Sequence, residues 1–378
     1  MKILFVGGGT GGHFYPIIAV AQSVIKKSAE RRILAPLLYY MAPSKYNPRA
    51  LFDNTIDYIN VPAGKIRRYF SLLNFTDGLK TLLGCFLAVF KMYALYPDVI
   101  FGKGGYASFP PLFAAKLLRI PVVIHESDSK PGKVNLWASK FAVKIAVSYP
   151  EAANYFKVDK KKIAFTGNPI RREVMAPSEN GAREYFQLEP NMPVIVIIGG
   201  SQGAQMINDI IVEGLPELLN KYQIIHQTGK ANLDEIKQTT GEILRQHPHK
   251  SRYHPIDFLN ESALRMMSSV ANIIVSRAGS GAIFEIAAWG VPSIIIPLPH
   301  SVSHDQTSNA FTYARTGAAS VIEENNLSAH VVIAEINRIN DNPKIAEAMR
   351  AQAKAFAKPF AADTIADALL DIALSHER

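Results

Sequence analysis

The chain has 378 residues, of which 48% are hydrophobic and 19% charged, a composition typical of globular proteins rather than disordered ones. This length exceeds the usual size of one hydrophobic core, so two domains are expected. The single cysteine, Cys85, excludes an internal disulfide framework, and the sequence has no CxxC motif or Cys/His cluster that would indicate zinc. We therefore expect no metal and no other cofactor.

Positive charge is concentrated in the first part of the chain. Residues 1–167 carry 23 Lys and Arg against 9 Asp and Glu, whereas the remainder carries 18 against 23, which gives the total of +9. A basic half indicates an anionic partner. The sequence has no nucleic-acid motif, so we expect no nucleic acid and favour an anionic membrane surface or a lipid-linked phosphate. Strand character begins at residue 2 without a signal-peptide pattern, which predicts a cytoplasmic location.

Short apolar segments with strand character alternate with helical stretches along the chain. This alternation predicts parallel sheets with helices on both faces. The turn at 166–169 places a domain boundary after residue 167, giving domains 1–167 and 168–355, and a C-terminal helix within 356–378 is expected to cross back onto the first domain. The predicted strands are 3–6, 37–41, 99–101, 122–124, 145–147, 194–198, 224–226, 273–275 and 293–296.

The first glycine-rich loop, GGGTGGH at 7–13, follows a short apolar strand and precedes a helix. The first turn of a helix exposes unpaired backbone N–H groups at the positive end of its dipole, which suits phosphate. A nicotinamide dehydrogenase would need a carboxylate about 20 residues further on, at the end of the second strand, and segment 37–43 has none. Glycines that serve only close packing are the other alternative.

His13 ends this loop, at the start of the following helix. A histidine in this place is often only an exposed cap. Imidazole is also the side chain whose pKa best suits accepting a hydroxyl proton at neutral pH, and a helix N-terminus keeps it neutral. We take His13 as the candidate general base.

A basic and apolar segment lies at 64–90. Its apolar residues recur with helical spacing, which predicts one stripe along a helix. The alternatives are an ordinary core helix and a surface that lies on an anionic bilayer without crossing it. The most apolar stretch, 81–90, is far short of the roughly 20 residues that a spanning helix needs. The candidate membrane-facing residues are Lys65, Arg67 and Arg68, with Phe70 in the loop and Phe75, Leu79, Leu82, Leu83, Phe86 and Phe90 in the stripe.

Two further turns repeat the arrangement in the second half of the chain. The loop GGSQGA at 199–204 follows the apolar run 194–198, and RAGSG at 277–281 follows the strand 273–275. Because a helix follows each, each turn can direct N–H groups at an anion. Together with the first loop they predict two doubly wound lobes that face each other across a cleft, with a phosphate-bearing ligand between them.

Carboxylates near these turns suggest sugar binding. Glu285, one to two turns into a helix, either offsets the helix dipole or accepts both hydroxyls of a ribose. Asp305 and Gln306 follow the strand 293–296 and suit the vicinal hydroxyls of a sugar. His300 and His304 could suggest a metal, but no third ligand has a sensible spacing, so we reject a metal site.

Seven motifs occur in order along the chain: GGTGGH at 8–13, GKGGYAS at 102–108, HE at 125–126, GNPIR at 167–171, GGSQGA at 199–204, HQTG at 226–229, and RAGSG with Glu285 at 277–285. This set resembles the MurG family of bacterial N-acetylglucosaminyltransferases. The resemblance implies a GT-B fold, an α/β architecture of two doubly wound Rossmann-like domains. It also implies UDP-N-acetylglucosamine as donor and undecaprenyl-pyrophosphoryl-muramyl-peptide (lipid I) as acceptor.

The reaction that the resemblance implies is transfer of N-acetylglucosamine to the muramyl 4-hydroxyl with inversion, giving lipid II for peptidoglycan. The enzyme would then work as a peripheral protein at the cytoplasmic face of the plasma membrane. The resemblance leaves open whether other cell-wall synthesis proteins are further partners.

The resemblance also assigns residues. In the second domain it implies Phe258 and Leu259 on the uracil side, Ser201, Ser280 and Gly281 at the phosphates, Glu285 at the ribose, and Asp305 and Gln306 at the glucosamine hydroxyls. It implies Arg171 as a further donor contact. In the first domain it implies Thr10, Gly11, Gly12 and His13 facing the donor sugar and acceptor diphosphate, with Gly104, Gly105 and Tyr106 on the acceptor side.

One position departs from the family pattern. Where the family commonly has His-Glu-x-Asn, this chain has His125-Glu126-Ser127-Asp128. Asp128, a candidate donor contact, can accept a hydrogen bond from a sugar hydroxyl but cannot donate one as asparagine does, and it places negative charge near a diphosphate. Asp128 and Glu126 also remain alternatives to His13 as the general base.

Two other interpretations of the whole chain stay open. One is another GT-B nucleotide-sugar enzyme, either a soluble glycosyltransferase or a UDP-N-acetylglucosamine epimerase, which would not need the surface at 65–90. The other is a protein that binds a UDP-sugar without catalysis.

Overall fold

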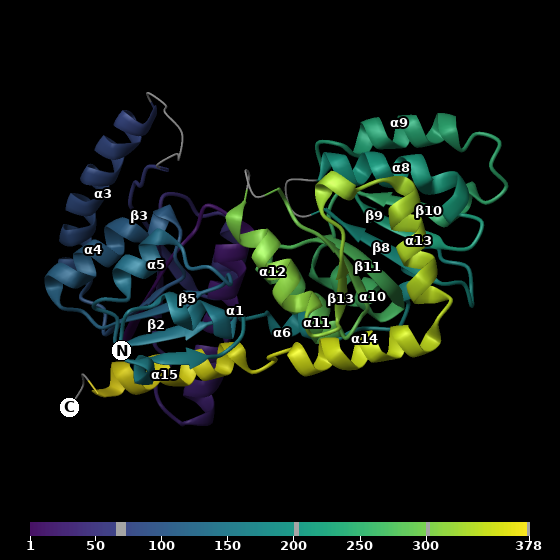
Figure 1. The fold of residues 1–378 in the computed structure, drawn as a ribbon. Helices are drawn as coiled ribbons and strands as arrows, with labels where there is room; N and C mark the ends of the chain where they lie inside the picture. Colours follow the sequence, from purple (N-terminus) through teal and green to yellow (C-terminus); the bar gives the residue numbers. More distant parts are fainter. Residues whose placement is uncertain (66–72, 200–203, 300–302, 376–378) are drawn as a thin grey trace. The chain divides into compact units, whose positions relative to one another are not determined.

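Residues 1–65, 73–199, 204–299 and 303–375 are described by the structure, a computed structural model. The chain divides into two compact units (Figure 1). The first unit is Met1–Arg171 together with Lys358–Arg378, and the second unit is Arg172–Ala357. Each unit contains one parallel sheet between layers of helices, as the alternating pattern predicts.

The first unit has a seven-stranded sheet in the order β3-β2-β1-β4-β5-β6-β7. Its elements are β1 (Lys2–Val6), α1 (Gly11–Glu30), β2 (Leu37–Ala42), α2 (Pro48–Asp53), β3 (Ile56–Asn60), α3 (Leu73–Leu95), β4 (Val99–Gly102), η1 (Tyr106–Ser108), α4 (Phe109–Leu118), β5 (Val122–Glu126), α5 (Lys133–Ala138), β6 (Lys144–Val147), η2 (Pro150–Tyr155), η3 (Lys160–Lys162), β7 (Ile163–Phe165) and α15 (Ala361–Ser375). The central strands β1, β4 and β5 are almost wholly buried because helices cover both sheet faces.

The second unit has a six-stranded sheet in the order β10-β9-β8-β11-β12-β13. Its elements are α6 (Arg172–Met175), α7 (Ala182–Tyr185), β8 (Val194–Ile198), α8 (Gln205–Leu218), β9 (Gln223–Gln227), α9 (Leu233–Ile243), η4 (Lys250–Arg252), β10 (Tyr253–Ile256), α10 (Glu261–Val270), β11 (Ala271–Arg277), α11 (Ser280–Trp289), β12 (Ser293–Ile296), α12 (His304–Ala314), β13 (Ala319–Val321), η5 (Glu324–Asn326), α13 (Ala329–Asn340) and α14 (Pro343–Phe356).

The nine predicted strands all lie within observed strands, and the sequence missed four others. The missed strands β3, β7, β10 and β13 are the outer strands of the two sheets. Edge strands are less buried and carry more polar residues or proline than central ones. β3 has the sequence IDYIN, β10 contains Pro255, and β7 and β13 have only three residues each. Their patterns therefore lack the unbroken apolar run by which the central strands were identified.

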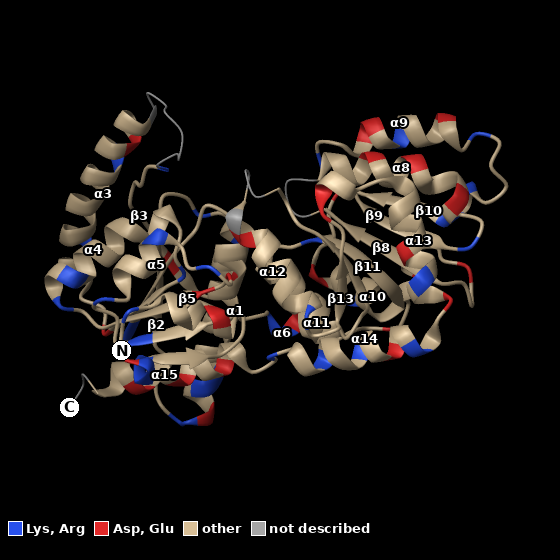
Figure 2. Cartoon of the chain, in the orientation of Figure 1, with Lys and Arg blue, Asp and Glu red and all other residues tan. Residues whose placement is uncertain are grey.

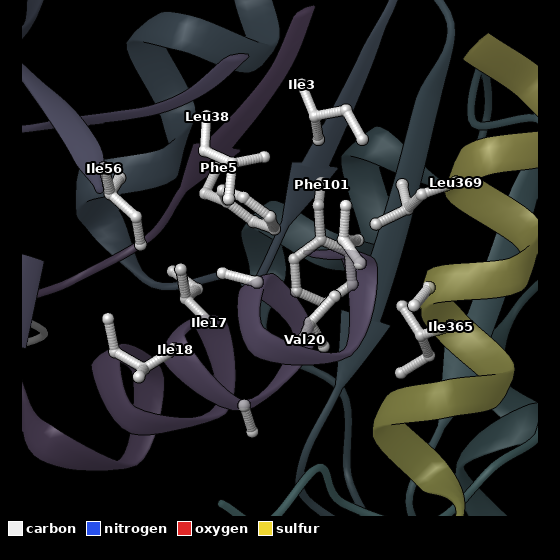
Figure 3. Packing of buried hydrophobic residues seen from close by; sticks show 14 of the residues in the cluster. Ile3, Phe5, Ile17, Ile18, Val20, Leu38, Ile56, Phe101, Ile365 and Leu369 are labelled. Carbon is white, nitrogen blue, oxygen red and sulfur yellow. The ribbon is translucent and has the colours of Figure 1, made fainter. Parts of the chain in front are cut away.

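Helix α15 completes the core of the first unit. Figure 3 shows Ile365 and Leu369 of α15 directed toward Phe101 of β4 and Val20 of α1, and all four are buried. At the end of α1, Arg31 pairs with two aspartates of α15, at 2.8 Å and 2.6 Å. Because these ion pairs are partly exposed, each contributes about 0–1 kcal/mol, so apolar burial is the main contribution to the docking of α15.

We expect Leu369→Ala to lower the free energy of unfolding of the protein by about 2–5 kcal/mol, because it leaves a cavity between α15 and the sheet. Urea unfolding followed by circular dichroism measures this. Phe360→Ala, a control just before α15 at a side chain that is 72% exposed, should change the stability little. Equal effects of the two substitutions would contradict the packing described.

Candidate active site

Both sheets reverse their strand order beside the first strand of the unit. In the first sheet the chain proceeds from β1 to β3 on one side and resumes with β4 on the other side of β1. In the second sheet the same reversal lies between β8 and β11. Ligands of doubly wound sheets bind at this reversal, beyond the carboxyl ends of the strands. The glycine-rich turns after β1 and β11 begin at this edge, and β8 also ends there.

His13 lies in the first turn of α1, beside two loops. Its Nδ1 is 2.9 Å from Oγ1 of Thr10, the residue that precedes the helix. With Nδ1–H donating to that hydroxyl, Nε2 is left as a proton acceptor. A Cβ added to Gly105 would lie 3.3 Å from Nε2, a tight contact, and Gly105 has φ +75°, a conformation that strains any residue with a side chain.

The charge of His13 follows from its surroundings. Burial, and secondly the Lys103 ammonium, lower the pKa of His13 to about 4. The imidazole is therefore neutral at pH 7. It is available as a base at that pH, although a lowered pKa makes it a weaker base than free imidazole.

Tyr106 places the acceptor-side loop against the first glycine loop. A Cβ added to Gly9, which has φ +89°, would lie 2.8 Å from Cε1 of Tyr106. A Cβ added to Gly104, which has φ +84°, would likewise lie 2.8 Å from Nδ2 of Asn135 on α5. The structure thus brings the predicted residues of 10–13 and 104–106 together at the ends of β1 and β4.

Glu126, at the end of β5, is buried and held by neutral donors. Its Oε1 accepts from the backbone N–H of Asp128 at 3.1 Å, and its Oε2 accepts from the N–H of Gly132 and from Nδ2 of Asn135 at 3.0 Å and 2.9 Å. Burial, and then the nearby Asp128 carboxylate, raise the pKa of Glu126. With both oxygens engaged, Glu126 orders the 126–132 turn and is a poorer candidate for the general base than His13.

Lys103 follows β4 directly and is buried among these groups. Its Nζ donates to Oγ of Ser127. Burial lowers the pKa of Lys103, while Glu126 and Asp128 oppose that change. The sequence contains Lys103 in the GKGGYAS motif, yet no role was assigned to it, because a lysine between glycines is normally solvated. Its position directly after a fully apolar strand is the one signal that could have identified it.

Arg171 and the turn before it belong to the same unit. His125 on β5 makes a 3.0 Å hydrogen bond from Nε2 to the carbonyl of Gly167, which fixes the turn that leads to Arg171. The guanidinium of Arg171 stacks 4.1 Å from the centre of the Tyr15 ring on α1. A Cβ on Gly11 would touch the same ring, so Arg171 lies close to the start of α1.

In the second unit, the turn after β11 and the start of α12 lie together. Ser280 is the first residue of α11, where backbone N–H groups have no acceptor within the helix, and a Cβ added to Gly281 would meet no atom within 4 Å. Glu285 lies on the second turn of α11 and is partly exposed. Nδ2 of Asn309 on α12 reaches the carbonyl of Ala278 at 3.5 Å, which joins the two helix starts.

The start of α12 is partly fixed by its own residues. Gln306 accepts a hydrogen bond from the N–H of Leu298 at 3.2 Å through Oε1, which leaves its amide group to donate elsewhere. Asp305, beside it, is partly exposed. Asp305 and Gln306 therefore lie close to the end of β12, as expected for the sugar-binding groups predicted from the sequence.

The 258–259 segment lies beyond β10. Leu259 is buried, and its N–H donates to Oε1 of Gln227 at the end of β9 at 3.2 Å. Phe258 is 51% exposed and offers an aromatic surface. Gln227 is a positioning residue that the sequence had not identified, although it lies in the HQTG motif. The predicted phosphate contact Ser201 lies outside the described residues.

Helix α3 presents its apolar stripe to solvent. Phe75, Leu79 and Phe86 are 74%, 54% and 61% exposed, whereas Ala88 and Met92 are buried. The interpretation of this stripe as part of an ordinary core helix is therefore wrong. The ribbon of α3 carries few charges (Figure 2). Lys65 is exposed, while Arg67, Arg68 and Phe70 lie outside the described residues.

The helix is longer than the apolar stretch 81–90. From Asn74 to Leu95 it has 22 residues, and an 18-residue window within it has a mean hydropathy of 1.5. By length and composition alone it could therefore cross a membrane, a criterion that core helices of soluble proteins also meet. The expectation that this segment is too short to span is thus corrected. One side of α3 is nevertheless packed closely, because a Cβ on Gly84 would lie 1.9 Å from the carbonyl oxygen of Pro62.

Within 1–65, 73–199, 204–299 and 303–375, no group of three or more His, Cys, Asp or Glu is placed to hold a metal ion.

Comparisons with known proteins identify the family of the chain. Residues 3–147 match the glycosyltransferase family 28 N-terminal domain, and residues 194–365 match the family 28 C-terminal domain. Two relatives are named UDP-N-acetylglucosamine–N-acetylmuramyl-(pentapeptide) pyrophosphoryl-undecaprenol N-acetylglucosamine transferase. The protein from Treponema denticola is 35% identical over 85% of this chain and 83% of its own length. The one from Bacillus cereus, numbered 2, is 36% identical over 90% of this chain and 92% of its own.

A solved structure agrees with the sequence relatives. The crystal structure of Acinetobacter baumannii MurG has a TM-score of 0.72 and 26% identity, covering 98% of this chain and 99% of that one. The GT-B fold that the sequence predicts is therefore confirmed. The chain belongs to glycosyltransferase family 28, within the MurG family of UDP-N-acetylglucosamine-dependent transferases.

Proposed function

We propose that the protein transfers N-acetylglucosamine from UDP-N-acetylglucosamine to the muramyl 4-hydroxyl of lipid I, with inversion, to give lipid II. The observation that carries this proposal is that relatives matching nine-tenths of the chain have this activity in their names. The geometry of both units supports this proposal. Each unit presents helix starts, glycines and polar side chains where the strand order of its sheet reverses.

In the first unit, His13 accepts the proton of the attacking hydroxyl. The oxygen then bonds to the anomeric carbon of the donor, the bond from that carbon to the diphosphate breaks, and UDP leaves with the electron pair. The neutral imidazole with Nε2 beside Gly105 supports this role. A positioned base contributes roughly 10²–10⁴ in rate.

In the second unit, the Ser280–Gly281 turn contacts the diphosphate through its backbone N–H groups, and Glu285 accepts hydrogen bonds from the ribose. Such preorganised donors stabilise the charge that develops on a leaving group. Phe258 and Leu259 contact the uracil. Asp305 and Gln306 form hydrogen bonds with the hydroxyls of the glucosamine. Arg171, at the end of the first unit, supplies a guanidinium, the planar donor best matched to phosphate oxygens.

The exposed stripe of α3 supports a peripheral location at the cytoplasmic face of the membrane, where the lipid acceptor resides. Apolar side chains enter the headgroup region, and basic residues such as Lys65 add about 1 kcal/mol each near an anionic surface. This surface also favours a lipid-linked acceptor over the soluble acceptor of another GT-B enzyme.

His13→Ala should lower kcat/KM for transfer to a lipid I analogue by roughly 10²–10⁴, because the base is lost. Calorimetric binding of UDP-N-acetylglucosamine should change little. His330→Ala, at an exposed histidine on α13, is the matched control. Retention of most of the activity by His13→Ala would exclude it as the base.

The pH profile tests the charge of the same residue. Because the pKa of His13 is lowered to about 4, kcat/KM should stay nearly level as pH falls from 7.5 to about 5.5 and decline only below that. A decline centred near pH 6.5, the ordinary pKa of histidine, would show that the pKa of His13 is not lowered.

Glu285→Ala should weaken donor binding about tenfold or more, because the ribose loses its acceptor, with tenfold equal to 1.4 kcal/mol. Calorimetry with UDP-N-acetylglucosamine measures this directly. Glu347→Ala on α14, also an exposed helical carboxylate of the second unit, should bind normally. An unchanged affinity of Glu285→Ala for UDP-N-acetylglucosamine would show that Glu285 does not bind the ribose.

Phe75→Ser, Leu79→Ser and Phe86→Ser together should reduce flotation with vesicles that contain anionic lipid by about tenfold or more. Phe52→Ser, at an aromatic residue on α2 that is 84% exposed, is the control. Undiminished flotation of the triple variant would place the membrane contact elsewhere.

A further inference from the structure

An ion pair at the carboxyl edge of the second sheet has no role in the transfer described so far. Arg277 is the last residue of β11, and Nη2 of its guanidinium donates to Oε1 of Glu324 at 2.5 Å. Both side chains are only 11% exposed. Because burial removes both charges from water, such a pair often stabilises a fold no more than apolar side chains of the same volume. The geometry that the pair fixes is therefore of more interest than its contribution to stability.

The pair reaches across the strand that lies between its two partners. The strand order here is β11-β12-β13, Arg277 lies opposite Ile296 at the end of β12, and Glu324 follows β13 in η5. The guanidinium therefore passes the end of β12. Its Nη1 donates a long, shared hydrogen bond to the carbonyl oxygens of Ile296 and Pro297, at 3.4 Å and 3.5 Å. One guanidinium thus connects the ends of three neighbouring strands.

The backbone that this guanidinium contacts leads directly to the predicted sugar-binding side chains. Pro297 is followed by Leu298, whose N–H donates to Oε1 of Gln306 at 3.2 Å. The carbonyl of Leu298 accepts a hydrogen bond from the Thr307 hydroxyl at 3.4 Å. Both hydrogen bonds end on the first turn of α12, which also carries Asp305. The position of that turn therefore depends on where the backbone lies at the end of β12.

We infer that Arg277 and Glu324 are positioning residues for the sugar of the donor: their ion pair fixes the end of β12 and, through it, the first turn of α12. This inference rests on the proposed function, in which Asp305 and Gln306 bind the glucosamine hydroxyls. The uracil contacts follow β10 and the ribose contact lies on α11, so neither depends on the end of β12. Loss of the pair should therefore weaken binding of UDP-N-acetylglucosamine more than binding of UDP.

The test uses Glu324→Leu, Arg277→Met and the two together, in the full chain, with UDP-N-acetylglucosamine and UDP each titrated by calorimetry. Each single variant leaves one charge buried without its partner, which should lower the urea midpoint of unfolding. The double variant removes both charges and should return the midpoint close to the wild-type value. The donor affinity relative to UDP should nevertheless fall about tenfold in all three, because the guanidinium is either lost or no longer held against the two carbonyl groups.

The double variant separates a positioning role from a merely structural one. If the pair only stabilised the fold, the double variant would recover the donor affinity together with the urea midpoint, and that recovery would overturn the inference. The control is Glu242→Leu, which breaks an exposed ion pair with Arg245 in the same unit. It should change neither the relative donor affinity nor the urea midpoint.

If any of these variants does not fold, Glu324→Gln decides the question. Glutamine keeps the shape and an acceptor oxygen but removes the charge that strengthens the hydrogen bond to the guanidinium. The donor affinity relative to UDP should fall about threefold or more, and an unchanged ratio overturns the inference. These measurements need no transfer reaction. A wild-type protein that binds the donor but does not transfer its sugar to a lipid I analogue contradicts the proposed function, while the affinity ratio still decides the role of the pair.

Discussion

The site depends on one constraint of parallel sheets: every strand ends at the same edge, and the strand order reverses beside β1 and beside β8. Segments far apart in sequence are therefore brought together by backbone pairing alone. In the first unit these are the loop 7–13, residues 103–106 and residues 125–128, which lie at the ends of three neighbouring strands. Because the central strands are buried on both faces, polar and titratable groups occur mainly where these strands end.

Burial then determines the charge states at that edge. It favours the neutral forms of His13, Glu126 and Lys103 alike, and the nearby charges modify this effect: Asp128 adds to it at Glu126 and opposes it at Lys103. The first unit is also the basic one, with its surplus of lysine and arginine, and one of these cations, Lys103, is buried. Net charge thus indicates an anionic partner, whereas the chemistry depends on a few groups whose solvation only the folded chain determines.

The sequence predicted the central strands and the glycine-rich turns because both leave strong local patterns. It missed β3, β7, β10 and β13 because edge strands need no continuous apolar run. For α3, periodicity predicted a stripe from Phe75 to Phe90 but not what the stripe faces, because spacing alone does not distinguish a buried side of a helix from an exposed one. Lys103 and Gln227 were not identified because their importance comes from burial and from partners on other strands, which a linear motif does not show.

The most direct measurement of the central claim is a crystal structure of the protein bound to UDP. We expect the diphosphate against the first turn of α11, near Ser280 and Gly281, and the ribose hydroxyls within hydrogen-bonding distance of Glu285. A nucleotide bound instead at the loop 7–13 of the first unit, with the start of α11 empty, would contradict the assignment of the donor to the second sheet.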